Sequence, residues 1–281
     1  YRERQPSAPR ACTFQYALPP ARDAAGAPGR PQSALSRILV IANAALYADP
    51  AARQAIDRYL QDIRAGYGCG AELLTAQGGT PEDIKSLIQG RCFHEGLSGV
   101  VFIGRLADAW FEIDNDHPQW QGGYGYADWT CDLFFMDMDG AWGDADRDGL
   151  YDSHADGAGD RSAEIFMGRI DTTPMGSYGT EVELLRRYMD KNHAYWSGGI
   201  PLYHYGLAYI DHDWSDQGAG YFAGLYGAAA YHALLWPGPA ETPVGKSDYV
   251  ANRLQLPYYG FTQVWTHADH FAHSFHTGGL C

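Results

Sequence analysis

The run RILVIANAA, residues 37–45, decides the fold of this chain. It is apolar almost throughout and has the length of one strand, a pattern typical of strands buried on both faces of a parallel sheet. Similar runs follow at residues 71–76 and 100–103. Between them, Asp49 before Pro50 and the capping box at residues 80–83 each indicate the start of a helix. Strand, helix, strand, helix and strand in this order predict a parallel α/β sheet with right-handed crossovers.

The second half of the chain repeats this pattern of strands and helices. The segment FIGRL at residues 102–106 is echoed by FMGRI at residues 166–170, which indicates two related α/β halves. A second capping box at residues 180–183 predicts another helix. Further strands are expected at residues 132–138, 164–170, 207–210 and from 261 onward, with helices at 219–235 and 248–254, and a long surface loop at 115–130.

Charge and hydropathy exclude some classes of partner. The net charge of -14 argues against nucleic-acid binding and is compatible with a soluble extracellular protein or a cation binder. No apolar run is long enough to predict a membrane span. The cysteines are odd in number and fit no zinc motif, so two interpretations stay open: one or two disulfides with a free thiol, or scattered buried thiols. They are Cys12, Cys69, Cys92, Cys131 and Cys281.

An acidic segment lies in the middle of the chain. Its carboxylates are opposed in sequence only by Arg147 and Arg161, and charges packed this closely repel unless a cation holds them. They are Asp137, Asp139, Asp144, Asp146, Asp148, Asp152, Asp156, Asp160 and Glu164.

The inner part of this segment, DADRDGLYD at residues 144–152, matches the start of an EF-hand-type calcium loop. The EF-hand glutamate at position 12 is replaced by Ala155, so we expect an isolated loop of this type and no full EF-hand. The alternative is a solvated acidic turn. The expected ligands of a structural Ca²⁺ ion are Asp144, Asp146, Asp148, the carbonyl of Leu150, and Asp152.

The C-terminal stretch FTQVWTHADHFAHSFHTGGLC, residues 261–281, begins as a strand and continues into a histidine-rich segment. Enzymes with α/β folds hold catalytic groups at the carboxyl ends of their strands. His267, at the strand end, is therefore the preferred general base for a nearby cysteine or serine. Two alternatives remain: a zinc site shared by His267, His270 and His273 on a helix, or loop histidines bonded to backbone and solvent.

Cys281 is the cysteine closest in sequence to this histidine segment. A helical crossover does not fit between His267 and Cys281, so an ordinary buried thiol is the favoured interpretation and a nucleophile the alternative.

The order of these parts resembles the gingipain-type cysteine peptidases of the caspase-like group. Three blocks carry the resemblance, which covers residues 37–281, and the middle block is the most specific. They are GGTPEDIKSLIQG with GVVFIGRLADAWFEI (78–90 and 99–113), TCDLFFMDMDGAWGDADRDGLYD with EIFMGRID (130–152 and 164–171), and VWTHADHFAHSF (264–275).

The resemblance implies a caspase-like three-layer sandwich of two α/β subdomains, endopeptidase activity on polypeptides, bound calcium, and a secreted or cell-surface location. It also implies a His–Cys dyad in which His267 is the base, with an oxyanion hole of backbone N–H groups near the histidine turn. Asp211 and Asp213 can orient the histidine or can cap the loop. The chain departs from the family where Ala268 replaces the usual glycine, and the family's cysteine falls beyond the last residue. We therefore expect a chain truncated at its C-terminus and lacking its nucleophile.

The predicted organisation has four parts: an extended leader or arm at 1–36, a first α/β subdomain at 37–130, the acidic calcium loop at 131–163, and an incomplete second α/β subdomain at 164–281. The predicted function is a secreted, calcium-stabilised cysteine endopeptidase. The alternatives are a non-catalytic calcium-stabilised binding or adhesion module on the same fold, and a metal hydrolase using the histidines from His267 to His276.

Overall fold

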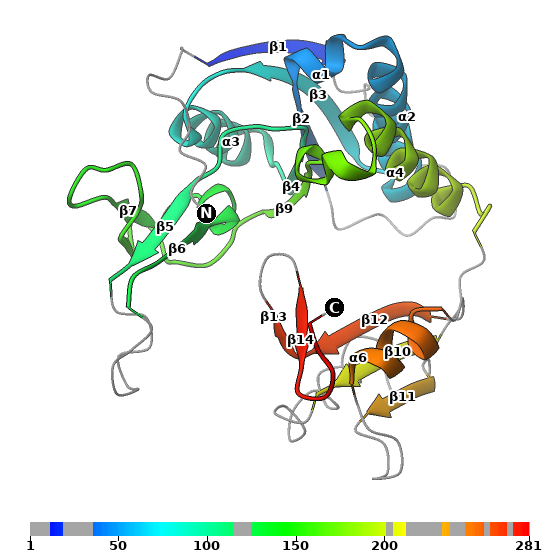
Figure 1. The fold of residues 1–281 in the computed structure, drawn as a ribbon. Helices are drawn as coiled ribbons and strands as arrows, with labels where there is room; N and C mark the ends of the chain where they lie inside the picture. The colour runs from blue at the N-terminus through cyan, green and yellow to red at the C-terminus, as the bar shows by residue number, and fades with distance from the viewer. Residues whose placement is uncertain are drawn as a thin grey trace. The chain divides into compact units, whose positions relative to one another are not determined.

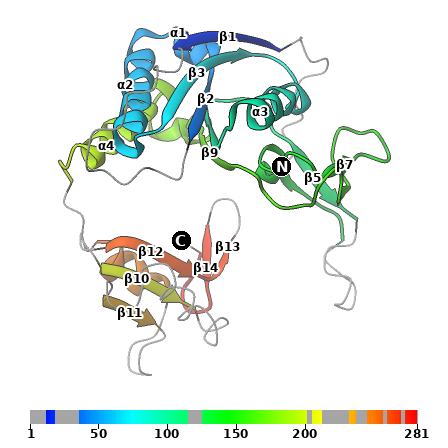
Figure 2. The same ribbon diagram turned by 180° about the vertical axis from the view of Figure 1, so that it is seen from behind.

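The fold was obtained as a computed structural model (Figures 1 and 2). The structure describes residues 12–18, 36–114, 125–200, 205–211, 232–236, 245–255, 259–268 and 272–280. Contacts divide the chain into two compact units, Tyr1–Gly199 and Ile200–Cys281, and each unit is described by itself. No helix in the described ranges is both long and apolar enough to span a membrane.

The first unit is built on a five-stranded sheet with the order β1-β3-β2-β4-β9. All neighbouring strands run parallel except β1, which is antiparallel to β3. This sheet confirms the predicted α/β class. The strands are β1 (Thr13–Leu18), β2 (Arg37–Asn43), β3 (Gly70–Gln77), β4 (Gly99–Ile103) and β9 (Phe166–Ile170).

Helices cover both faces of this sheet, which gives three layers (Figures 1 and 2). Along β2, Ile38 and Val40 belong to one core and Leu39 and Ile41 to the other, because alternate side chains of a strand point to opposite faces. The first core also contains residues of α1 (Ala44–Ala48), α2 (Pro50–Tyr67) and α4 (Glu181–Trp196), and the second contains residues of α3 (Pro81–Glu95).

The predicted helix starts are confirmed by their capping bonds. The Asp49 carboxylate accepts the N–H groups of Ala51 at 2.8 Å and Ala52 at 3.0 Å, directly before α2. At α3, the Asp83 N–H donates to the Thr80 hydroxyl at 3.3 Å while the Thr80 N–H donates to the Asp83 carboxylate at 2.9 Å. The box at residues 180–183 forms in the same way before α4. Each cap contributes about 1 kcal/mol to helix stability.

Some predicted elements differ from the structure. The strand expected at residues 132–138 is wrong, because Asp132–Phe135 forms a 3-10 helix, η1. Phe134 and Phe135 are consecutive and both buried in the same core, whereas a strand would point them to opposite faces. The end of the expected 115–130 loop forms β6 (Ala127–Thr130), which pairs with β5 (Trp110–Ile113). The end of the expected 219–235 helix lies in a strand, β11 (His232–Trp236).

The boundary between the two units lies later in the sequence than the predicted subdomain boundary. Strand β9, which the sequence analysis assigned to the second subdomain, pairs with β4 through the register Phe102↔Arg169. In α4, Leu185 and Met189 lie in the same core as Ile56 of α2. Residues 164–199 therefore belong to the first unit, and the echoed FIGRL and FMGRI segments lie on neighbouring strands of one sheet.

The second unit contains a three-stranded parallel sheet with the order β11-β10-β12. A small antiparallel sheet of β13, β14 and β15 follows it. The described core consists of Leu207, Tyr209, Tyr249 and Phe275. The bounds are β10 (Tyr205–Ile210), α6 (Lys246–Asp248), the π-helical turn η4 (Tyr249–Arg253), β12 (Tyr259–Trp265), β13 (His267–Ala268), β14 (His273–Phe275) and β15 (Gly279–Leu280).

Glu72 on β3 is a fully buried carboxylate that opposes folding at neutral pH. Neither of its oxygens accepts a hydrogen bond from the described residues, and the Arg91 guanidinium lies 3.4 Å away. Burial raises the pKa of Glu72, helped by Glu95 and opposed by Arg37. Because the pKa is raised in the folded state, the stability linked to Glu72 is fully present below its ordinary pKa of about 4.3 and is lost as pH rises through the folded value.

We therefore expect Glu72→Gln to increase the free energy of unfolding at pH 7, with the gain disappearing near pH 4 because both proteins are then neutral at this position. Urea unfolding at the two pH values measures the difference. The control Asp156→Asn removes an exposed carboxylate that does not act on Glu72, and it should leave the free energy of unfolding nearly unchanged at both pH values. A loss of stability in Glu72→Gln at pH 7 would contradict this prediction.

Candidate functional site

The predicted calcium loop folds so that its carboxylates converge. The Asp144 carboxylate accepts the N–H groups of Arg147 at 2.7 Å and Gly149 at 3.0 Å. Arg147 and Gly149 have φ values of 65° and 93°, in the left-handed region that a sharp turn needs. Ligand atoms of Asp144, Asp146 and Asp152 all lie within 4.8 Å of one another. Such a group of oxygens suits a hard cation.

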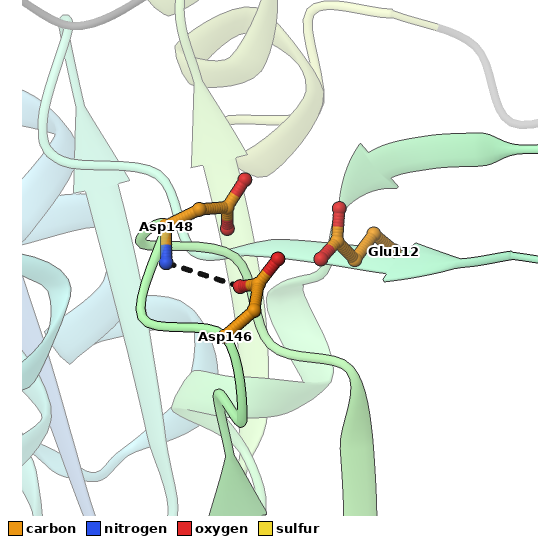
Figure 3. Close-up of side chains that lie close together, drawn as sticks. All are labelled: Glu112, Asp146 and Asp148. Atoms are coloured by element: carbon orange, nitrogen blue, oxygen red, sulfur yellow. Dashed lines mark hydrogen bonds between the residues drawn. The ribbon is translucent and has the colours of Figure 1, made fainter.

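A carboxylate on strand β5, which the sequence analysis missed, joins the four aspartates of the loop. Oxygens of Glu112, Asp146 and Asp148 also lie within 4.8 Å of one another. Figure 3 shows Glu112 on its strand beside the two loop aspartates, with the Asp148 N–H donating to Asp146 at 3.1 Å. The Tyr126 hydroxyl donates to Glu112 at 2.6 Å and so orients its carboxylate.

Backbone pairing explains why Glu112 reaches the loop. The Glu112 N–H donates to the Tyr151 carbonyl, and the Tyr151 N–H donates to the Trp110 carbonyl, both at 2.8 Å. At position 12 of the loop, Ala155 lies in β8 (Ser153–Ala155) paired with β7 (Ala141–Gly143) and offers no side-chain oxygen. Glu112 thus brings in the carboxylate that the loop itself lacks, and no signal within the loop sequence could have identified it.

Tyr151 fixes the loop to the body of the first unit. Its ring stacks on Phe134 with centroids 4.7 Å apart, and its hydroxyl donates to Glu82 of α3. Burial, and then the bond to Glu82, raise the pKa of Tyr151 far above its ordinary value, so the hydroxyl stays a donor at every physiological pH. Tyr151 therefore attaches the C-terminal part of the loop to α3.

A second acidic group lies beside the loop. Ligand atoms of Asp137, Asp139 and Glu164 are within 4.8 Å of one another. The Asp137 side chain is fully buried and lies 2.5 Å from Nε2 of His154. Burial works against its ionisation, but bonds from the Gly140 N–H, His154 and the Asp139 N–H, together with the charge of Lys85, outweigh it and lower the pKa of Asp137.

His267 lies where the sequence predicts a catalytic base. Strand β12 ends at Trp265, and His267 follows in β13, exposed and paired with Ser274 of β14. Because β12 runs parallel to β10, His267 is at the carboxyl end of a parallel strand.

Asp211 fixes the backbone around this histidine. It is fully buried directly after β10, and its Oδ2 accepts the His276 N–H at 2.8 Å and the Thr266 hydroxyl at 3.4 Å. Of the two roles considered for it, these bonds support capping of the turn. Asp213, the other candidate, lies outside the described residues, as do His270 and Cys281.

The histidine-rich segment is not helical in its described part. His267 and His273 lie on paired strands, so the helical spacing that the zinc alternative requires is not formed there. Within the described ranges, the groups that bring three possible metal ligands together contain only aspartate and glutamate.

The described cysteines do not have the character of nucleophiles. Cys12, Cys69, Cys92 and Cys131 are all free, so the described cysteines form no disulfide. Burial is the main cause that raises the pKa of each thiol, to about 11 for Cys12. Activated cysteines have lowered pKa values instead.

Removal of the Asp211 carboxylate is expected to loosen the turn that carries His267. In Asp211→Ala, the buried partner of the His276 N–H is lost, which costs about 1–3 kcal/mol. Hydrogen exchange of the His276 amide should become faster, whereas the control Thr262→Ala, at an exposed site on β12, should leave it unchanged. An unchanged exchange rate in Asp211→Ala would show that the turn does not depend on this carboxylate.

Comparisons with family models, with curated proteins and with solved structures find no match to this chain.

Proposed function

We propose that this chain is part of a calcium-stabilised cysteine endopeptidase in which His267 is the general base. The observation that carries the proposal is the position of His267 at the carboxyl end of a parallel strand, on a turn fixed by the buried Asp211. This is the edge at which α/β enzymes assemble their sites. The resemblance of the sequence to gingipain-type peptidases supports the same role, together with a secreted or cell-surface location.

In the proposed reaction, His267 takes the proton of a cysteine thiol, and the thiolate attacks the carbonyl carbon of the scissile peptide. Backbone N–H groups near the turn stabilise the negative charge on the carbonyl oxygen. His267 then donates the proton to the leaving amine, and a water activated by the same histidine releases the acid and restores the thiol. The described thiols are partly or fully buried and have raised pKa values, so Cys281 is the candidate nucleophile among the cysteines of this sequence.

The proposed calcium site consists of the loop carboxylates, the Leu150 carbonyl and Glu112. Asp144, Asp146, Asp148 and Asp152 are the side-chain ligands expected from the sequence, and their oxygens meet within the two overlapping groups described above. Ca²⁺ takes six to eight oxygen ligands in flexible geometry, so an added strand carboxylate fits its coordination. The role of the ion is structural, since it holds together charges that otherwise repel.

Treatment of the intact protein with a thiol reagent and with a chelator tests the proposal. Iodoacetamide should abolish cleavage of a polypeptide substrate, and a zinc-selective chelator should not. The reverse result would favour the metal hydrolase that uses the histidines from His267 to His276.

A non-catalytic calcium-stabilised binding or adhesion module is the second candidate function. It is favoured by the location of all proposed calcium ligands in the first unit, which needs no residue of the second unit to form the site. Calcium-dependent stabilisation of the intact protein without any turnover would select this function.

A further inference from the structure

Strand β1 forms one edge of the five-stranded sheet, where it pairs with β3 (Figure 1). The ladder joins Thr13 to Gln77 at one end and Leu18 to Leu73 at the other. The strand that it covers, β3, is buried continuously from Ala71 to Ala76. Without β1, the backbone N–H and C=O groups of this buried strand would form an exposed edge, which is a template for pairing with another strand.

The side chains of β1 are less buried than those of the strand that it covers. Thr13 and Gln15 are exposed, and Phe14 and Ala17 are only half-buried against the two cores of the first unit. None of the described side chains of β1 is fully buried. The strand therefore depends mainly on its backbone ladder, which an extended segment from another chain can form with β3 in the same way.

The edge of β3 is shaped to receive the first residue of β1. Gly79, just beyond β3, has a φ of 94°. A Cβ placed on this glycine would lie 2.3 Å from the Cβ of Cys12, so a side chain at position 79 would collide with the bound segment. The close approach thus requires glycine at this position, and it fixes where the bound strand begins.

The connection between β1 and β2 is longer than the fold requires. Leu18 pairs with Leu73, and Arg37 pairs with Gly70 on the other side of β3. With strands about 4.8 Å apart and a rise of about 3.3 Å per residue, the ends to be joined lie about 14 Å from each other. An extended chain of about four or five residues spans this distance, whereas residues 19–36 can reach about 60 Å. The connection therefore allows β1 to leave its own β3 and to reach the β3 of a second molecule.

We propose that the edge of β3 is a binding site for an extended strand, which residues 12–18 fill from their own chain or from a second copy of it. The partner is a second molecule of this protein, joined by reciprocal exchange of β1. A tether of this length holds the strand at an effective concentration of roughly millimolar, so pairing within one chain dominates in dilute solution. Exchange dominates where molecules are held close together or where a chain has lost its own β1. This interaction uses no residue of the proposed catalytic or calcium site.

Disulfide trapping between full-length variants tests this proposal, with Cys12→Ala in every chain to remove the neighbouring thiol. Thr13→Cys and Gln77→Cys lie opposite each other in the ladder, and both positions are exposed. Placed together in one chain, they should form an internal disulfide, because directly opposed Cβ atoms are about 4.5–5.5 Å apart. Placed in separate chains, mixed at high protein concentration and mildly oxidised, they should form a disulfide between the chains. Non-reducing electrophoresis and peptide mass spectrometry detect the link.

Two controls distinguish strand exchange from random collision. Lys191→Cys, at an exposed position on α4, replaces Gln77→Cys in one mixture and should give no link above background. Phe14→Asp added to the Thr13→Cys chain should abolish the link, because a charged side chain does not pack against the core that Phe14 contacts. The same substitution added to the Gln77→Cys chain should increase the link, because the β1 of that chain no longer occupies the edge.

Each outcome decides for or against the exchange of β1. The proposal is overturned if the double variant forms its internal disulfide while the mixed chains link no more than the control pair. It is also overturned if the double variant forms no internal disulfide, since β1 then does not hold the register on which the site depends. Should Phe14→Asp not fold, the comparison of Gln77→Cys with Lys191→Cys decides alone, and equal linking of the two counts against exchange.

Discussion

Replacement of His267 by alanine in the intact protein is expected to reduce turnover of a polypeptide substrate by about 10²–10⁴-fold, the contribution of a positioned general base. His276→Ala should retain turnover, because the group of His276 that bonds Asp211 is its backbone N–H, which the substitution keeps. The measurement is kcat/KM for both variants across pH. Equal losses in the two variants would point to a shared metal ion instead of a base.

Chemical rescue distinguishes a base from a structural residue at this position. His267 is exposed, so its replacement leaves a site that imidazole from solution can enter. Added imidazole should restore part of the activity of His267→Ala, and it should have no effect on Asp211→Ala, in which the turn itself is altered. A variant that keeps its melting temperature and is not rescued would indicate that His267 does not transfer the proton.

The elements that sequence reasoning predicted correctly are those whose signals are local. The apolar run at residues 37–45 and the caps at Asp49, Thr80 and Thr180 specify strands and helix starts within a few residues, and the structure forms each of them. The turn at residues 144–152 belongs to the same class, because the spacing of its aspartates and Gly149 determines the turn in which their carboxylates converge, whereas calcium binding by this loop stays a prediction.

Features that depend on distant residues were missed or misplaced. Glu112 reaches the loop only through the pairing of β5 with Tyr151, which no pattern near residue 112 encodes. The η1 segment has strand-forming residues, but Phe134 and Phe135 both pack into the same core, which a strand does not allow for consecutive residues. The sequence of strand β9 resembles the start of a second α/β half. Its pairing with β4 depends on the sheet edge that β4 offers, which no residue near β9 encodes.

The double variant Asp144→Asn with Asp146→Asn is expected to lose the calcium-dependent stabilisation of the protein. An ion at about 100 times its dissociation constant stabilises the folded state by about 2.7 kcal/mol. For a unit of this size, that corresponds to a rise of about 5–10 °C in melting temperature. The wild type should therefore melt about 5–10 °C higher in Ca²⁺ than in EGTA, and the double variant should show no difference.

A matched control separates ion binding from loss of charge in general. Asp156 and Asp160 lie in the same acidic segment, but they are outside every group of carboxylates that meets within ligand distance among the described residues. Asp156→Asn with Asp160→Asn removes the same charge and should keep the calcium-dependent shift. If this control loses the calcium-dependent shift in melting temperature as fully as the loop variant does, the shift depends on the net charge of the segment and not on the loop ligands.

The direction in which the double variant changes the melting temperature in EGTA provides a second, independent criterion. Without an ion, the loop carboxylates repel one another, so the double variant should melt at or above the temperature of the wild type. In Ca²⁺ the order should reverse, because only the wild type gains the ion. If the two aspartates served only to accept the N–H groups of Arg147, Gly149 and Asp148, the variant would melt lower in both conditions. Reversal of the order between EGTA and Ca²⁺ is thus a result that a purely structural role of Asp144 and Asp146 cannot produce.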